Sequence, residues 1–198
     1  MKAVILDMYG VVIRQTGAEF APYIQKTFPA LTQEEIYAPW LRAYVGELPS
    51  AELWRQLGYR GDLAKQERDY LDTMELGEGF ESFAADAGKR CSLALLSNDV
   101  AEWNRYLRGK FGLDAVFGVV SVSGELRMKK PDARIFLHTL ERLGCRAEEC
   151  LFADDRIRNV LAAKRLGMRA VLFGEQPAPA DVEAAADFGR LAAILNGK

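Results

Sequence analysis

The sequence is poor in cysteine and histidine. Its 198 residues include three cysteines and a single histidine. Cys91, Cys145 and Cys150 form no C-x-x-C pair, and an odd number of cysteines cannot all be paired in disulfides within the chain. This usage is typical of a reducing compartment, so we expect the protein to be cytoplasmic. His138 falls inside a predicted helix, and we interpret it as a surface or packing residue rather than a catalyst.

The sequence also lacks an excess of charge and any long apolar run. Lysine and arginine number 26 and aspartate and glutamate 28, so the formal net charge is -2. Nothing in this balance indicates nucleic acid or an acidic membrane surface as a partner. The longest apolar runs fall far short of the roughly 20 residues of a membrane-spanning helix. Asp7 interrupts the apolar start and no small-residue cleavage site follows, which argues against a signal peptide.

What the sequence does have is the composition of an ordinary globular protein, with 49% hydrophobic and 27% charged residues. Its first element is residues 3–6, AVIL, directly followed by Asp7. Such a run predicts a strand buried on both faces, and Asp7 would lie where open parallel sheets bind their ligands. Taken alone, Asp7 fits equally well a residue that merely ends a strand or caps a turn.

Strand and helix patterns alternate in the second half of the chain. We predict strands at residues 92–96, 116–122, 150–153 and 170–173. Helices are predicted between and after them, at residues 101–111, 132–143, 158–166 and 181–195. This alternation predicts an α/β fold with a parallel sheet and right-handed crossovers.

Residues 14–78 break the alternation. They contain helical patterns at 18–28, 33–45, 50–57 and 63–76 and no convincing apolar strand. A block of this length exceeds one crossover connection, so we predict a separate helical cap at 14–78 and a core at 1–13 and 79–198. Trp40, Tyr44 and Trp54 are expected to form the small core of this cap.

Polar and charged residues follow four successive predicted strands. They are Asp7, then Ser97 with Asn98, then Lys130, then Asp154 with Asp155. Each has a purely structural explanation, as a helix cap or a solvated charge. Because the carboxyl ends of parallel strands meet at one edge of the sheet, their joint occurrence favours a common site.

The chemistry of this set suits phosphoryl transfer. A carboxylate such as Asp7 can attack phosphorus to form an acyl-phosphate, while Ser97 and Lys130 hold the equatorial oxygens. Asp7 and Asp155 together can hold Mg²⁺, which prefers oxygen ligands. We therefore predict Asp7 and Lys130 as catalytic residues and Ser97, Asn98 and Lys130 as substrate-binding residues.

Four segments carry a resemblance to a known family. They are LDMYGVV at 6–12, LLSND at 95–99, KKPDARIF at 129–136 and LFADDRIRNVLAAKRLGM at 151–168. In this order and spacing they resemble the motifs of the haloacid dehalogenase superfamily. The resemblance implies a Rossmann-like core with sheet order 5-4-1-2-3 and an α-helical cap inserted after the first strand.

The same resemblance implies the roles of individual residues. Asp7 would be the nucleophile, Ser97 and Lys130 the phosphate ligands, and Asp155 the acidic metal ligand. The main-chain carbonyl of Tyr9 would be a further ligand, and Asp154 ranks second to Asp155. The implied function is a Mg²⁺-dependent phosphatase that acts on a small phosphorylated metabolite through an aspartyl-phosphate.

Tyr9 departs from the family pattern. Phosphatases of the family usually carry an aspartate at this position, where it serves as general acid and base. A phenol with a pKa near 10 is a poor base at neutral pH. Loss of a positioned acid and base costs roughly 100- to 10,000-fold in rate, so we expect slow turnover or good leaving groups such as sugar 1-phosphates and acyl-phosphates.

Two alternative functions stay open. Tyr9 also resembles the D-x-Y-G-T motif of metal-independent 2-haloacid dehalogenases, but Val11 replaces the threonine and Asp154 and Asp155 would repel a carboxylate substrate. The other alternative is a catalytically weak binding or regulatory protein. GELPSAELW at 46–54 resembles the cap of epoxide hydrolase amino-terminal phosphatases and related sugar-phosphate phosphatases, and we favour the phosphatase.

Overall fold

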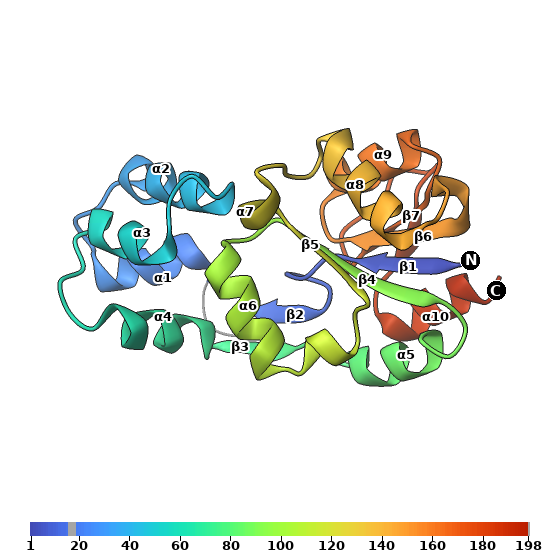
Figure 1. Ribbon diagram of the computed structural model, residues 1–198, viewed down its shortest axis with the longest axis horizontal. Helices are drawn as coiled ribbons and strands as arrows, with labels where there is room; N and C mark the ends of the chain where they lie inside the picture. The colour runs from blue at the N-terminus through green and yellow to red at the C-terminus, as the bar shows by residue number, and fades with distance from the viewer. Residues whose placement is uncertain (16–18, 198) are drawn as a thin grey trace.

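The computed structural model describes residues 1–15 and 19–197, and its centre is a six-stranded parallel sheet. The strand order is β5-β4-β1-β6-β7-β8 (Figure 1). The strands are β1 (Ala3–Leu6), β4 (Ser92–Ser97), β5 (Val119–Val122), β6 (Cys150–Asp154), β7 (Arg169–Phe173) and β8 (Glu183–Ala185). If β1, β4, β5, β6 and β7 are numbered 1 to 5 along the chain, the sheet read from β7 towards β5 has the order 5-4-1-2-3, as predicted. The α/β fold is therefore confirmed.

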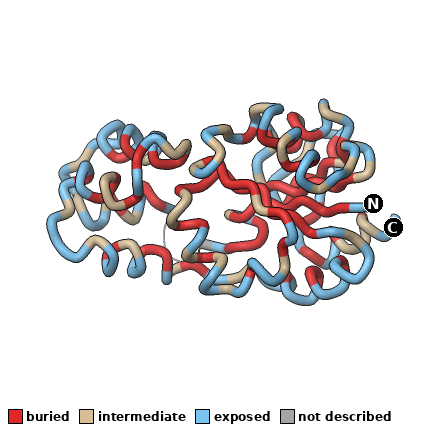
Figure 2. The backbone as a smooth tube through the Cα atoms, in the orientation of Figure 1, coloured by how far each residue is buried: buried red, intermediate tan, exposed pale blue. Residues whose placement is uncertain are grey.

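The central strands are buried on both faces, as their continuous apolar sequences require. Every residue of β1 is fully buried, with Val4 and Leu6 in one hydrophobic cluster and Ala3 and Ile5 in the other. Because successive side chains of a strand point to opposite faces, these clusters lie on the two sides of the sheet. Figure 2 shows the resulting concentration of buried chain in the strands.

Helices cover both faces of the sheet (Figure 1). Residues of α5 (Phe80–Ala87), α6 (Ala101–Lys110) and α10 (Phe188–Leu195) belong to the first cluster. Residues of α8 (Ala133–Leu143) and α9 (Ile157–Arg165) belong to the second. One short helix, α7 (Ser123–Leu126), follows β5. This two-sided cover leaves the carboxyl edge of the sheet as the place where side chains from different strands meet.

A helical region follows the first strand, as predicted. It consists of α1 (Phe20–Thr27), α2 (Gln33–Tyr44), α3 (Ser50–Gln56) and α4 (Leu63–Leu71). A capping box between Thr32 and Glu35 begins α2, which satisfies free amide groups at its amino end. The predicted helix at 18–28 included Ala18, which lies outside the described residues. The predicted boundaries of a cap at 14–78 stay a prediction.

The structure corrects three sequence predictions. The helix predicted at 63–76 ends at Leu71, and β3 (Met74–Leu76) pairs antiparallel with β2 (Ile13–Gln15). The strand predicted at 116–122 begins only at Val119. Residues 183–185, predicted as helix, form the edge strand β8. β2, β3 and β8 are three residues long, so pairing with a distant segment decides their conformation rather than local sequence.

No helix in the described part of the chain is long and apolar enough to cross a membrane.

Candidate active site

The centre of the site is a buried lysine between two carboxylates. Lys130 Nζ lies 2.7 Å from Asp7 Oδ1 and 2.7 Å from Asp154 Oδ2. The lysine is 1% exposed, and such a charge is tolerated in the interior only when it is paired. Asp7 directly follows β1, and its own amide donates to the carbonyl of Ala153 on β6. The structure thus brings together three of the charged residues predicted from the strand ends.

Asn98 determines the position of Lys130. Its side-chain amide donates to the carbonyl of Lys130 at 2.9 Å and accepts from the Lys130 amide at 2.7 Å. This reciprocal pair joins the end of β4 to the loop that carries the lysine. We predicted Asn98 as a substrate ligand, and the structure gives its side chain a clear positioning contact, although Asn98 also lines the pocket described below.

Asp154 is saturated with hydrogen bonds. Oδ1 accepts from the Arg156 amide and from Asn159 Nδ2, while Oδ2 accepts from Lys130 and again from Asn159. An ionised carboxylate has about four acceptor sites, and all of those of Asp154 are in use. Asp154 therefore anchors Lys130, and it is less available than Asp155 as a metal ligand.

Asp155 is the available acid. Its Oδ1 is buried without a hydrogen-bond partner among the described residues. Oxygens of Asp7, Asp154 and Asp155 lie within 4.8 Å of one another. This oxygen-rich set, in which Asp155 Oδ1 lacks a partner, fits a hard cation such as Mg²⁺, for which Asp7 and Asp155 would be the carboxylate ligands.

The backbone that follows β1 leaves room for the Asp155 side chain. Gly10 has a φ of +79°, and a Cβ at this position would lie 2.6 Å from Asp155 Oδ2. The Gly10 amide donates to the Ile13 carbonyl, and the Ile13 amide donates to that of Met8. Neither of these two bonds uses the Tyr9 carbonyl, which we predicted as a metal ligand.

Ser97, the last residue of β4, is fully buried, and its hydroxyl has no hydrogen-bond partner in the described part of the chain. A buried hydroxyl without a partner is costly unless a ligand or water satisfies it. Ser97 is not among the described residues that line the pocket, whereas Asp7 and Lys130 are.

Burial and mutual charge shift the acid groups at the site. Burial raises the pKa of Asp7 well above its ordinary value, and the nearby Asp154 adds to this rise. Burial and Asp154 raise the pKa of Asp155 in the same way. Burial opposes the charge of Lys130, but Asp154 and Asp7 outweigh it and raise the pKa of the ammonium. The lysine is therefore a fixed positive charge at neutral pH.

Tyr9 is bound to a carboxylate that the sequence did not indicate. Its Oη lies 3.2 Å from both carboxylate oxygens of Asp99. Asn104 and the Val100 amide donate to the same group. Burial raises the pKa of Asp99 to about 8, despite the opposing effect of these hydrogen bonds. Asp99 is the last residue of the LLSND segment, but nothing in the sequence distinguished it from a residue that caps the following helix.

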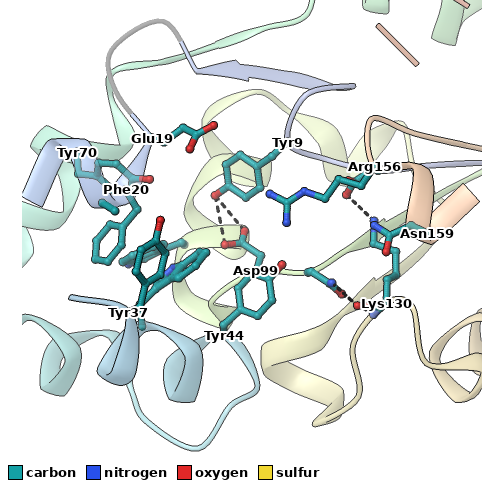
Figure 3. A pocket seen from close by; sticks show the side chains of 15 residues that line it. Tyr9, Glu19, Phe20, Tyr37, Tyr44, Tyr70, Asp99, Lys130, Arg156 and Asn159 are labelled. Carbon is teal, nitrogen blue, oxygen red and sulfur yellow. Dashed lines mark hydrogen bonds and ion pairs between the residues drawn. The ribbon is translucent and has the colours of Figure 1, made fainter. Parts of the chain in front are cut away.

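A pocket extends from these residues towards the helical region. Figure 3 shows Lys130 and Asn159 at one end and Phe20, Tyr37 and Tyr70 at the other. Besides Tyr9, the aromatic lining residues are Phe20, Tyr37, Trp40, Tyr44, Tyr70 and Trp103. Trp40 and Tyr44, which we predicted as cap core, thus border the site, while Trp54 is fully buried.

Residues 1–167 match the profile of the haloacid dehalogenase-like hydrolases. The match covers most of the chain, and the protein belongs to this family of hydrolases.

Curated relatives extend the comparison. Phosphoserine phosphatase of Thermus thermophilus is 29% identical over 208 aligned positions, covering 88% of this chain and 83% of that protein. Sesquiterpene phosphatase astK of Aspergillus oryzae is 24% identical over 173 positions, covering 84% of the chain and 87% of the relative. Drimenol cyclase drtB of Aspergillus calidoustus is 26% identical over 182 positions, covering 87% of the chain. The chain spans only 34% of the length of that cyclase.

Solved structures share the fold. The enzyme BT-2542 of Bacteroides thetaiotaomicron, in complex with magnesium and inorganic phosphate, superposes with a TM-score of 0.76 at 19% identity, covering 91% of this chain and 98% of that one. L-2-haloacid dehalogenase of Xanthobacter autotrophicus, with chloropropionic acid covalently bound, superposes with a TM-score of 0.73 at 20% identity, covering 100% of this chain and 99% of that one.

Proposed function

We propose that the protein is a Mg²⁺-dependent phosphatase that acts on a small phosphorylated metabolite through an aspartyl-phosphate on Asp7. The observation that carries the proposal is the Lys130 ammonium at 2.7 Å from both Asp7 and Asp154. A lysine held in this way is positioned to bind a phosphate oxygen beside the carboxylate that attacks phosphorus. Asp154 keeps the lysine in place and leaves Asp7 free to react.

The orphaned polar atoms support the same function. A phosphate oxygen would give the Ser97 hydroxyl the partner it lacks. Asp7, Asp155 and the carbonyl of Tyr9 would hold Mg²⁺, as predicted from the sequence. When bound, Mg²⁺ supplies positive charge that offsets the repulsion between carboxylates and phosphate.

The reaction follows from the positions of these groups. An oxygen of Asp7 attacks phosphorus, the bond to the leaving oxygen breaks, and that oxygen takes the electron pair. Water then attacks the phosphorus of the aspartyl-phosphate and restores the Asp7 carboxylate. Since Tyr9 stands in place of a carboxylic acid, the leaving oxygen has to be stable as an anion. Acyl-phosphates and sugar 1-phosphates meet this condition better than ordinary alkyl phosphates.

The relatives agree with this class of reaction. Two of them are named phosphatases, of phosphoserine and of a sesquiterpene. The structure of BT-2542 was obtained with magnesium and inorganic phosphate, the cofactor and product class proposed for this chain.

The two alternatives make different demands on the site. A dehalogenase has to bind a 2-haloacid carboxylate next to Asp7, where Asp154 and Asp155 already place negative charge. A catalytically inert protein would bind Mg²⁺ and phosphate but turn over no ester.

Acetyl phosphate tests the proposal, because its acetate leaving group needs no general acid. We expect release of inorganic phosphate with Mg²⁺, loss of this activity with EDTA, and loss of at least roughly 100-fold in Asp7→Asn. Asp86→Asn, an exposed carboxylate on α5 that pairs with Lys89, is the matched control. Halide release from 2-chloropropionate in EDTA would instead establish the dehalogenase, and no turnover of either compound would establish the inert protein.

A further inference from the structure

The far end of the pocket is a wall of aromatic rings. Tyr37, Trp40 and Tyr44 lie on one stripe of α2, since their spacing of three and four residues places them on the same helical face. Their rings contact one another, with centroids 5.6 Å apart for Tyr37 and Trp40 and 5.0 Å for Trp40 and Tyr44. Phe20 stacks on Trp40 at 5.8 Å and extends the wall.

This wall is not completely covered by the protein. Tyr37 is 37% exposed, so part of this residue is accessible to a ligand. Next to the wall, the indole N–H groups of the buried Trp54 and of Trp103, which also lines the pocket, both donate to Glu67. The wall presents aromatic ring surface to the pocket, which suits contact with an apolar group.

Arg156 lies between the aromatic wall and the reactive carboxylate. Its side chain extends from the start of α9 into the pocket, towards Tyr9 and Tyr44 (Figure 3). The nearest ion-pair contact given by the structure is a long one, 4.0 Å from Nε to Asp155 Oδ1, and the side chain is 49% exposed. The guanidinium is thus placed to bind a second anionic group of a ligand that already contacts Lys130.

The leaving group also has to depart without a proton from the residue at position 9. The phenol of Tyr9 is directed at Asp99 and not free to replace the missing carboxylic acid. A leaving oxygen that belongs to a phosphate needs no proton, because the phosphate anion is stable at neutral pH. An anhydride bond between two phosphates therefore suits this site better than a bond to an alcohol.

We propose that the substrate is an organic diphosphate with an apolar hydrocarbon body. This inference rests on the proposed phosphatase function. Asp7 attacks the terminal phosphorus and the bond to the bridging oxygen breaks. The electron pair stays on that oxygen, and an organic monophosphate leaves beside Arg156. Water then supplies the oxygen and protons of inorganic phosphate, so one diphosphate and one water give one monophosphate and one inorganic phosphate.

Geranyl diphosphate is the direct probe. With Mg²⁺ we expect one inorganic phosphate per molecule, with geranyl monophosphate as a persistent product, because its further cleavage requires an alkoxide to leave. Its kcat/KM should exceed that of ADP, a diphosphate with a polar body, by at least roughly tenfold. Acetyl phosphate, which has neither a second phosphate nor a hydrocarbon body, serves as the internal reference for every variant.

Variants separate the two recognition elements. Arg156→Gln should lower the ratio of kcat/KM for geranyl diphosphate to that for acetyl phosphate by roughly 10- to 100-fold, and Arg156→Lys should restore part of it. Tyr37→Ala should lower the same ratio by roughly three- to tenfold. Leu41→Ala, an exposed apolar residue of the same helix that does not line the pocket, should leave the ratio unchanged.

Three results would overturn the inference. They are a preference for ADP, faster cleavage of phosphoserine or phosphocholine than of geranyl diphosphate, and equal ratios in Arg156→Gln and Leu41→Ala. If acetyl phosphate is hydrolysed in an Asp7-dependent way while geranyl diphosphate is not, the phosphatase function stands and the substrate class is wrong. If neither is hydrolysed, the phosphatase function itself fails.

Discussion

The phenol of Tyr9 donates a hydrogen bond to Asp99, with its oxygen 3.2 Å from each carboxylate oxygen. The two residues follow neighbouring parallel strands, β1 and β4. The contact directs the side chain at position 9 towards the end of β4. It therefore engages the phenol with Asp99, and it makes the Tyr9–Asp99 pair testable.

Replacement of Tyr9 by an acid should change which substrates are cleaved. We expect Tyr9→Asp to raise kcat for an alkyl phosphate such as n-butyl phosphate by roughly 100-fold, since a positioned acid contributes 10²- to 10⁴-fold. Acetyl phosphate should be affected much less, because acetate leaves without a proton. Steady-state phosphate release with both substrates measures this difference, and Tyr9→Asn is the uncharged control. A fall in kcat with both substrates would mean instead that Tyr9 contributes to substrate fit.

Asp99 should make stability depend on pH. Its folded-state pKa of about 8 lies above its ordinary value of 3.8, so the folded protein holds a proton that the unfolded chain releases. This stabilising contribution is complete below about pH 4 and is lost as the pH rises through 8. Relative to Asp99→Asn, the unfolding free energy of the wild type should fall by up to ~1.4 kcal/mol per pH unit over that window.

Urea unfolding of both proteins at pH 5, 6.5 and 8 measures this difference. The asparagine variant keeps an acceptor for Tyr9 and removes the titration, so other titrating groups cancel in the comparison. A difference that stays constant with pH would show that Asp99 is ionised throughout in the folded protein.

Lys130 should be important for stability as well as for activity. Lys130→Met leaves Asp7 and Asp154 buried without their common cation, and breaking a buried ion pair in this way costs roughly 3 to 5 kcal/mol. The double variant Lys130→Met with Asp154→Asn removes one of the stranded charges and should recover part of that loss. Equilibrium unfolding of the wild type and both variants provides the test, and equal stability of the two variants would contradict it.

The sequence predicted which side chains meet at the carboxyl edge of the sheet better than it predicted the pocket beside them. Asp7, Lys130 and Asp155 each follow a buried strand or the loop after one, and strand order alone brings them together. The hydrogen-bond saturation of Asp154 and the contact of Asn98 with Lys130 depend on side-chain geometry, which motifs do not encode. These specific contacts could therefore not be predicted from the sequence.

The pocket residues escaped prediction for a different reason. Trp40 and Tyr44 have the helical spacing of core residues, and the same spacing also places residues on a ligand-facing wall. Whether such residues form a core or line a pocket depends on how α2 packs against the strand ends. Arg156 lines the pocket (Figure 3), and nothing in the sequence distinguishes such an arginine from a solvated one.

The glycine after Tyr9 should matter for the metal ligand as well as for the turn. Gly10→Ala introduces a side chain at a φ of +79°, with its Cβ 2.6 Å from Asp155 Oδ2, so Asp155 has to move. Gly112→Ala is a matched control, because Gly112 has a φ of +64° and open space around its Cβ position. Both variants should lose roughly 1 to 2 kcal/mol of stability through backbone strain.

Only Gly10→Ala should also weaken Mg²⁺ binding, because only there does the new methyl group displace a proposed ligand. The midpoint of Mg²⁺-dependent activation with acetyl phosphate should rise at least roughly tenfold, as it does when metal ligands are misplaced. Thermal shifts on addition of Mg²⁺ give a readout independent of catalysis, and the shift should shrink in Gly10→Ala alone. Identical Mg²⁺ responses in the two variants would mean that Asp155 does not hold the ion in the proposed position.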